Sequence, residues 1–197
     1  MTTLRPFLPI LPILFAAAVA VPASAQAPAM SPKPASPTAP ALPVAANPAG
    51  QATLLGQFGD WGAYAATPGG RKVCFALAKP TSATTDPPGR KRDASYLFVS
   101  TRPAERVKDE VSAIVGYPQR ANVDASAAIG PANYAMYTQN DGAWVKNAAE
   151  ETQMVEAMRK GAELVIKSVS TQGTKTTDTY SLKGISQALD RVAQECN

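Results

Sequence analysis

Short runs rich in apolar residues recur between residues 56 and 182, and in residues 109–118 the apolar side chains alternate onto one face. A period of two residues is typical of β-strands that bury one face, and these runs are rich in aromatic and β-branched residues. Pro-Gly-Gly, Asp-Gly and Gln-Gly sequences separate several of the runs and favour tight turns. The pattern predicts about seven or eight strands, in the segments 56–66, 72–78, 95–102, 109–118, 133–139, 143–146, 162–170 and 175–182.

Two segments change to the helical period of 3.6 residues. Residues 147–161 begin with Asn147, a good N-cap, and end at Gly161, which we expect to close the helix in a left-handed conformation. The second segment is an amphipathic helix expected at the C-terminal end, where one apolar face is built by Ile185, Ala188, Leu189, Val192 and Cys196.

Residues 81–93 are polar and contain two prolines, which predicts a long loop.

Short strands, tight turns and two helices indicate a mainly β protein. We expect a β-sandwich with one internal and one C-terminal α-helix, and a partly open β-barrel is the alternative. Residues 53–197 are enough for a single domain with its own hydrophobic core. We therefore expect no second domain.

The N-terminal region has the composition of an export signal. An apolar stretch follows Arg5 and leads to a small-residue site that ends at Ala25. This order predicts a signal peptide over residues 1–25, cleaved between Ala25 and Gln26. A membrane anchor is the alternative, but prolines interrupt the stretch, which is shorter than the roughly 20 apolar residues of a spanning helix. We therefore expect an exported chain with no transmembrane segment in its mature form.

Residues 26–52 are almost all Pro, Ala, Ser and Thr, and predict a disordered linker. The linker is either a spacer that holds the domain away from a surface or a tolerated tail. The net charge of the chain is +4, but Arg5 and Lys33 lie outside the domain. The remaining excess of positive charge is small, so nucleic acid is not an expected partner.

The chain contains two cysteines and no histidine. In an exported protein an even number of thiols indicates a disulfide, so we expect Cys74 to pair with Cys196; two free buried thiols are the alternative. The bridge would close a loop of about 120 residues. Without histidine a metal site of the usual ligands is not expected, and the sequence predicts no cofactor.

The lack of histidine also excludes Ser-His-Asp and Cys-His catalysis, and no Ser-x-x-Lys motif is present. Glu150 and Glu151 are adjacent on the predicted helix and point about 100° apart, so they are interpreted as first-turn charges. Arg90, Lys91 and Arg92 form a basic cluster in the predicted loop. We interpret these three residues as a candidate partner-binding site for an anionic surface, with a solvated loop as the alternative.

Five longer segments carry a family resemblance: FGDW (58–61), KVCFALAKP (72–80), YLFVSTRPAERVKDEVSAIVGYP (96–118), DGAWVKNAAEETQMVEAMRKG (141–161) and YSLKGISQALDRVAQEC (180–196). Together they resemble the invasion-associated locus B family of exported proteins of Gram-negative bacteria, over nearly all of residues 56–196. The resemblance implies an immunoglobulin-like sandwich in the periplasm, in the cell envelope or secreted. The family is named for a role in host-cell invasion, and it supplies no catalytic residues to transfer.

The leading hypothesis is a non-catalytic periplasmic or envelope-associated protein. It would contribute to host-cell invasion or envelope integrity by binding an unknown protein or another envelope partner. One alternative is a periplasmic chaperone-like protein that exposes an apolar sheet edge. A second alternative is a hydrolase that works without histidine.

Overall fold

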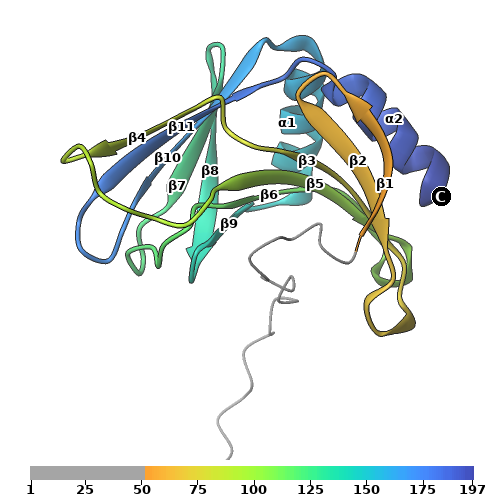
Figure 1. Cartoon of the computed structure of the whole chain (residues 1–197), viewed down its shortest axis with the longest axis horizontal. Coiled ribbons are helices and arrows are strands. Elements are labelled where there is room, and N and C mark those ends of the chain that lie inside the picture. Colours follow the sequence, from red (N-terminus) through yellow and green to blue (C-terminus); the bar gives the residue numbers. More distant parts are fainter. Residues whose placement is uncertain (1–51) are drawn as a thin grey trace, which may run out of the picture. The chain divides into compact units, whose positions relative to one another are not determined.

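The computed structural model describes residues 52–197 (Figure 1). Helix α1 (Ala148–Lys160) is internal and helix α2 (Ile185–Glu195) is C-terminal, so the structure is mainly β with the two helices that the sequence predicts. The eleven strands are β1 (Thr53–Phe58), β2 (Trp61–Ala66), β3 (Val73–Ala78), β4 (Ser82–Asp86), β5 (Tyr96–Arg102), β6 (Val107–Ile114), β7 (Ala125–Ile129), β8 (Ala132–Gln139), β9 (Gly142–Val145), β10 (Glu163–Val169) and β11 (Lys175–Ser181).

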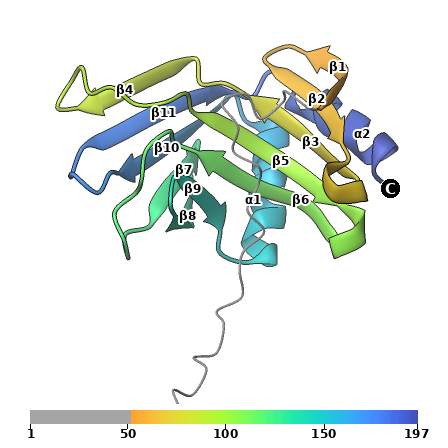
Figure 2. The same cartoon turned by 60° about the horizontal axis from the view of Figure 1, so that its bottom comes forward.

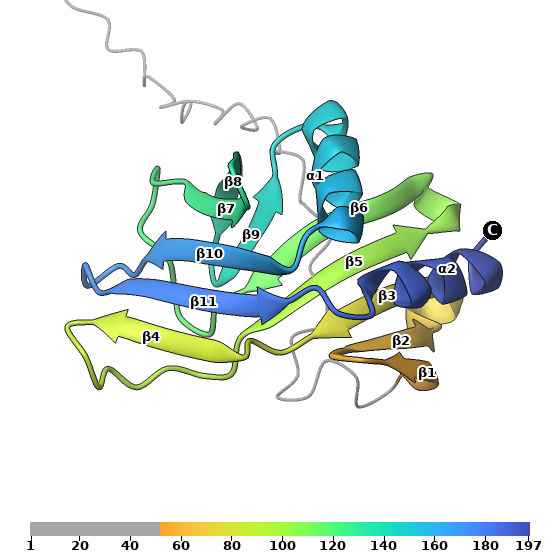
Figure 3. The ribbon, with the colours of Figure 1, turned by 90° about the horizontal axis from the view of Figure 1, so that it is seen from above.

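All eleven strands belong to one antiparallel sheet, in the order β1-β2-β3-β5-β6-β9-β8-β7-β10-β11-β4. The sheet bends, so β3, β5 and β6 lie on one side of the main core and β10 and β11 on another (Figures 1 and 3). The two layers expected of a sandwich are therefore two halves of one continuous sheet. Strands β1 and β4 form its edges.

Three strands have no clear signal in the sequence. Strand β4 lies in the stretch 81–93, where the prediction of a continuous loop is wrong. Among the described strands it pairs only with β11 and forms an exposed edge, so its Ser and Thr residues need no apolar alternation. Strand β7 has the sequence ASAAI, and alanine is a poor strand former. Strand β1 lies at the other edge and has a bulge between Leu54 and Gly56.

Helix α1 begins as expected, because the Asn147 side chain accepts a hydrogen bond from the Glu150 backbone N–H at 2.9 Å. Its end differs from the prediction. Gly161 has φ −82° and ψ 165°, which is extended backbone, so the expected left-handed conformation is wrong. Close packing favours glycine there instead, since a β-carbon at this position would lie 2.7 Å from Cγ2 of Ile129.

Helix α2 lies across β1, β2 and β3 and buries the apolar face that the sequence predicts (Figure 3). Its N-cap, Gly184, has φ 96°, a conformation that side chains disfavour. The same glycine approaches β1 closely, because a β-carbon at this position would lie 1.8 Å from the carbonyl oxygen of Phe58. The start of α2 is therefore fixed both by backbone conformation and by contact with the first hairpin.

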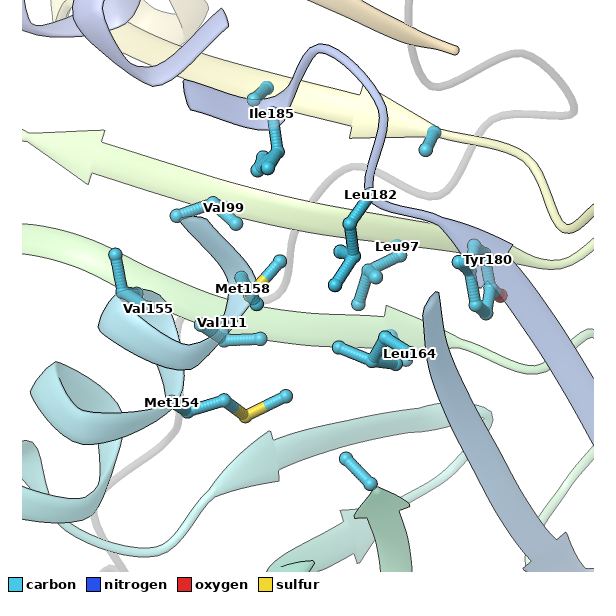
Figure 4. Packing of buried hydrophobic residues seen from close by; sticks show 14 of the residues in the cluster. Leu97, Val99, Val111, Met154, Val155, Met158, Leu164, Tyr180, Leu182 and Ile185 are labelled. Carbon is cyan, nitrogen blue, oxygen red and sulfur yellow. The ribbon is translucent and has the colours of Figure 1, made fainter. Parts of the chain in front are cut away.

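The main core lies on one face of the sheet, which we call the inner face, and both helices pack on this face. Figure 4 shows side chains from both halves of the sheet and both helices meeting there. The Trp61 indole is fully buried and its N–H donates to the Ser181 carbonyl at 2.9 Å, so β2 is linked to the end of β11. Fully buried members of the core include Leu97, Val99, Val111, Met154, Met158, Leu164, Ile185 and Leu189.

Candidate binding surface

The predicted disulfide is present: Cys74 and Cys196 are joined, with their Cα atoms 5.9 Å apart. Cys74 lies on the inner face of β3 and Cys196 directly follows α2, and both are buried. Beside the bridge, the Lys72 ammonium donates to the backbone carbonyl and to the carboxylate of Glu195, at 2.7 and 2.8 Å. The disulfide and the Lys72–Glu195 contacts hold the C-terminal end of α2 against β3. The role of both cysteines is therefore structural.

The structure separates the three residues of the basic cluster. Arg92 turns inward, where its guanidinium donates to both carboxylate oxygens of Asp178 on β11 and to the Val115 carbonyl. The Arg92 side chain is 10% exposed and that of Asp178 only 1%. Hydrogen bonding to Asp178 raises the pKa of Arg92 above its usual value. Arg90 and Lys91 stay exposed, so they are the two residues of the cluster that can reach a partner.

An open hollow of about 690 Å³ lies beside this loop. Lys91 lines it together with Asp93, Tyr117 and Asp141. Because the carboxylates of Asp93 and Asp141 accompany the ammonium of Lys91 in the lining, the hollow has mixed charge. It is not arranged to select an anion.

A second apolar cluster lies on the opposite, outer face of β2, β3, β5 and β6. Neither helix of the described region packs on this side of β3, β5 and β6, and Figure 2 shows these strands in front of α1. Tyr64 stacks on Phe75 with ring centroids 5.4 Å apart, and Phe75 contacts Phe98 at 5.8 Å. Such offset and tilted pairs are favourable aromatic geometries.

The outer cluster extends across β9 and β8. Trp144 lies opposite Tyr137 in the register, and their rings stack with centroids 5.5 Å apart. We call the whole surface the aromatic face. It consists of Tyr64, Phe75, Leu77, Tyr96, Phe98, Ile114, Tyr137 and Trp144.

Two glycines let rings of the aromatic face lie along their own strands. A β-carbon at Gly142 would lie 2.2 Å from Cη2 of Trp144, and one at Gly62 would lie 2.6 Å from Cε2 of Tyr64. Both positions are therefore occupied by aromatic carbon rather than by a side chain of the glycine residue. The result is a flattened aromatic surface.

Polar groups border the aromatic face on two sides. At one end of β5, Arg102 donates to the carboxylates of Glu105 and Glu110 at 2.7 to 2.9 Å. Toward β10 and β11, a hollow of about 460 Å³ is lined by polar residues that include Lys167 and Lys175. An apolar centre with a polar rim is the usual anatomy of a protein interface.

Sequence interpretation missed the aromatic face, although its signal was present. VCFALA in β3 and YLFV in β5 are apolar at every position rather than at every second one. A strand with no alternation is typically covered on both faces. The main core packs on the inner faces of these two strands, and the aromatic residues lie on their outer faces.

Glu151 has a contact beyond its expected role as a first-turn charge. Its carboxylate accepts a hydrogen bond from the Val111 backbone N–H at 2.7 Å. The pairing of β6 with β9 covers only Ser112–Ile114. Glu151 therefore accepts the hydrogen bond of a backbone N–H, that of Val111, which lies beyond the residues paired with β9. Burial, with a smaller repulsion from Glu110, raises the pKa of Glu151 to about 7 in spite of the Val111 hydrogen bond.

The Glu151→Gln variant is expected to be more stable than the wild type at about pH 8 and equally stable at about pH 5. With a pKa of 4.5 unfolded and about 7 folded, the folded wild-type chain holds more protons between these values, and therefore loses stability as the pH rises through them. Glutamine keeps an oxygen for Val111 and does not ionise. Because Glu151 is partly exposed, we expect a gain of about 1 kcal/mol at the higher pH, measured by urea unfolding.

Glu150→Gln is the matched control, since Glu150 lies in the same turn and its side chain accepts no backbone hydrogen bond from β6. If Glu151→Gln loses as much stability between the two pH values as the wild type does, the pH dependence has another origin.

The remaining sequence predictions concern chemistry and export. Within residues 52–197, no group of three or more His, Cys, Asp and Glu side chains is placed to hold a metal ion. Neither described helix combines the length and the apolar character needed to cross a bilayer. The predicted cleavage site between Ala25 and Gln26 lies outside the described residues.

Comparison with known proteins identifies the family. A family model described as the invasion associated locus B (IalB) protein matches residues 61–193. Searches of curated proteins and of solved structures gave no match. The matched range runs from β2 into α2 and includes every residue of the aromatic face. The chain therefore belongs to the invasion associated locus B family.

Proposed function

We propose that this protein is exported to the periplasm by a signal peptide that is cleaved between Ala25 and Gln26, and that it acts there by binding a protein partner through the aromatic face. The observation that carries the proposal is the second apolar cluster, which lies outside the core that the fold requires. Tyrosine, tryptophan and phenylalanine are enriched at the centres of interfaces. Membership of an envelope-associated family fits this non-catalytic role.

The margin of the aromatic face supplies the groups that a partner would meet first. Tyr137 is 38% exposed, and Tyr64, Tyr96 and Trp144 are partly exposed. Arg90 and Lys91 would add attraction for an acidic partner, mainly by raising the rate of encounter. Binding of this kind would serve envelope integrity or host-cell invasion, the two roles that the leading hypothesis from the sequence names.

The sheet edges favour recognition by side chains over the strand addition of a chaperone. A bulge interrupts β1, and β4 has only five residues, followed by Pro87 and Pro88. Short edges, bulges and prolines are devices that prevent an added strand from pairing.

Crosslinking in living cells tests the proposal. A photoreactive residue placed at Tyr137 is expected to capture a defined envelope protein, and Tyr96→Ser in the same chain is expected to weaken that capture. The same photoreactive residue at Glu156, exposed on α1, is the control and is expected to capture nothing defined. Capture of a defined protein from Arg90 or Lys91, with none from Tyr137, would contradict binding by the aromatic face.

A further inference from the structure

We propose that the polar hollow on the outer face of β4, β7, β10 and β11 binds a polysaccharide whose sugars carry carboxylate groups, such as uronic acids. The inference goes beyond the proposed function, because it needs no protein partner. A site of this kind would attach the domain to an acidic glycan of the cell envelope.

The first observation is the place of the hollow in the fold. It has a volume of about 460 Å³ and is lined by four strands that are consecutive in the sheet, with β4, β11 and β10 side by side in Figure 3. Lys167 and Thr177 alternate along their strands with the buried Ile166 and Asp178, so they point to the outer face. Both helices pack on the inner face. The hollow is therefore open to solvent.

The second observation is a row of hydroxyls around one ammonium. Successive positions across β7, β10, β11 and β4 in the register are occupied by Ser126, Lys167, Thr177 and Thr84. Neighbours in such a row have Cβ atoms about 5 Å apart, so Lys167 has a hydroxyl on either side. Within residues 52–197, no carboxylate lies at ion-pair distance from the Lys167 ammonium. An ammonium between two hydroxyls can donate several hydrogen bonds to one carboxylate.

The third observation is the balance of charge in the hollow. Asp124 forms an ion pair with Lys146, and Asp86 lies opposite Lys175 in the register, close enough to balance its charge. Of the charged side chains that line the hollow, Lys167 is left without an opposite charge. The hollow beside the β4–β5 loop differs, because two aspartates accompany one lysine there. A single uncompensated ammonium suits a singly charged carboxylate better than a doubly charged phosphate.

The mixture of polar groups favours a sugar over other anionic ligands. The ammonium groups of the lining only donate hydrogen bonds and its carboxylates only accept them, whereas each sugar hydroxyl does both. Asp86 and Asp124 would repel a simple anion, but they can accept from the hydroxyls of a sugar. A protein interface would need an apolar centre, and Val169 is the only apolar residue among the described residues that line the hollow.

Tyr137 supplies an aromatic ring at the border of the hollow. It lies beside Asp124, because the pairing of β7 with β8 continues one residue beyond Ala125 and Met136. The side chain is 38% exposed, so its ring can pack against the apolar C–H face of a sugar. Tyr137 also belongs to the aromatic face. A glycan in the hollow and a protein partner on the aromatic face would therefore be held side by side.

Calorimetric titration of the purified exported protein with three probes tests the ligand class. Oligogalacturonate carries both carboxylates and sugar hydroxyls. Its methyl ester keeps the hydroxyls and loses the charge, and polyglutamate keeps the charge and has no hydroxyls. We expect oligogalacturonate to bind, with an affinity that falls as salt is added, and both other probes to bind about tenfold more weakly or not at all.

Substitutions in the hollow test its position. Lys167→Gln is expected to weaken the binding of oligogalacturonate about tenfold, because it removes a charged donor, and Thr177→Val about threefold, because it removes a neutral one. Lys160→Gln is the matched control. It changes the net charge by the same amount on α1, where the Lys160 side chain is 78% exposed, and should keep the wild-type affinity. Lys167 is exposed as well, so its replacement should leave the fold intact.

Several results would overturn the inference. Failure of the wild-type protein to bind oligogalacturonate would reject the site. Equal losses for Lys167→Gln and Lys160→Gln would show that the ligand responds only to net charge. Equal affinity for the methyl ester would reject the role of the carboxylate, and equal affinity for polyglutamate would reject the role of the sugar. Amide NMR shifts on β3 and β5, with none at Ser126, Lys167 and Thr177, would place the ligand on the aromatic face instead.

Discussion

Asp178→Asn is expected to lower the free energy of unfolding by about 3–5 kcal/mol, because it leaves the Arg92 guanidinium buried without its counter-charge. The two side chains are 10% and 1% exposed, and the carboxylate accepts from both terminal nitrogens of the arginine. The pair also attaches the β4–β5 loop to β11. Urea unfolding of the purified variant measures the loss.

Asp190→Asn is the matched control, because the Arg159–Asp190 pair is also an arginine–aspartate contact but its carboxylate is 62% exposed. Breaking an exposed pair is expected to cost less than about 1 kcal/mol. The double variant Arg92→Met and Asp178→Leu should recover much of the loss, since no unpaired charge remains. Equal costs for Asp178→Asn and Asp190→Asn would show that Arg92 is solvated once Asp178 is neutral.

Replacing either cysteine by serine is expected to cost about 2–5 kcal/mol, because the Cys74–Cys196 bridge restricts the unfolded chain over a sequence separation of 122 residues. The double replacement should cost little more than either single one, since both single variants remove the same bond. The fold should survive, because Ile185, Leu189 and Val192 remain buried against the sheet. Denaturant unfolding of the three variants measures these values.

Thiol titration supplies an independent measurement of the bridge. The natively exported wild-type protein should show no reactive thiol after unfolding without reductant, and each single variant should show one. Ala193→Ser, a small change in the same helix, is a control and should leave stability nearly unchanged. Additive costs of the two cysteine replacements would argue that the two side chains act separately through packing.

Sequence patterns predicted the elements whose signals are local. The apolar face from Ile185 to Val192 predicts α2 because residues three and four apart share one side of a helix. Asn147 predicts the start of α1 because a cap needs only a neighbouring backbone N–H. Strands β5 and β8 are recognisable from their aromatic and β-branched residues. An even cysteine count in an exported chain was enough to predict the disulfide.

Long-range pairing decided what the sequence left open. Strand β4 exists because Thr84 and its neighbours pair with β11, about 90 residues later, and nothing in the local sequence marks that partner. No local sequence signal identifies Asp178 as the partner of Arg92, so the sequence alone predicts Arg92 to be one of three exposed cations in a loop. The same holds for Glu151, whose hydrogen bond to Val111 depends on where β9 ends.

The sequence by itself determined the class of the protein, its two helices, its disulfide and its family, because each of these depends on local periodicity, composition or a long motif. Only the tertiary structure decided that the strands form one bent sheet and that Tyr64, Phe75, Phe98 and Trp144 share its outer face. The physical reason is register. A side chain's face follows from which residue it pairs with on the next strand, and a shift of one residue would move it to the opposite side.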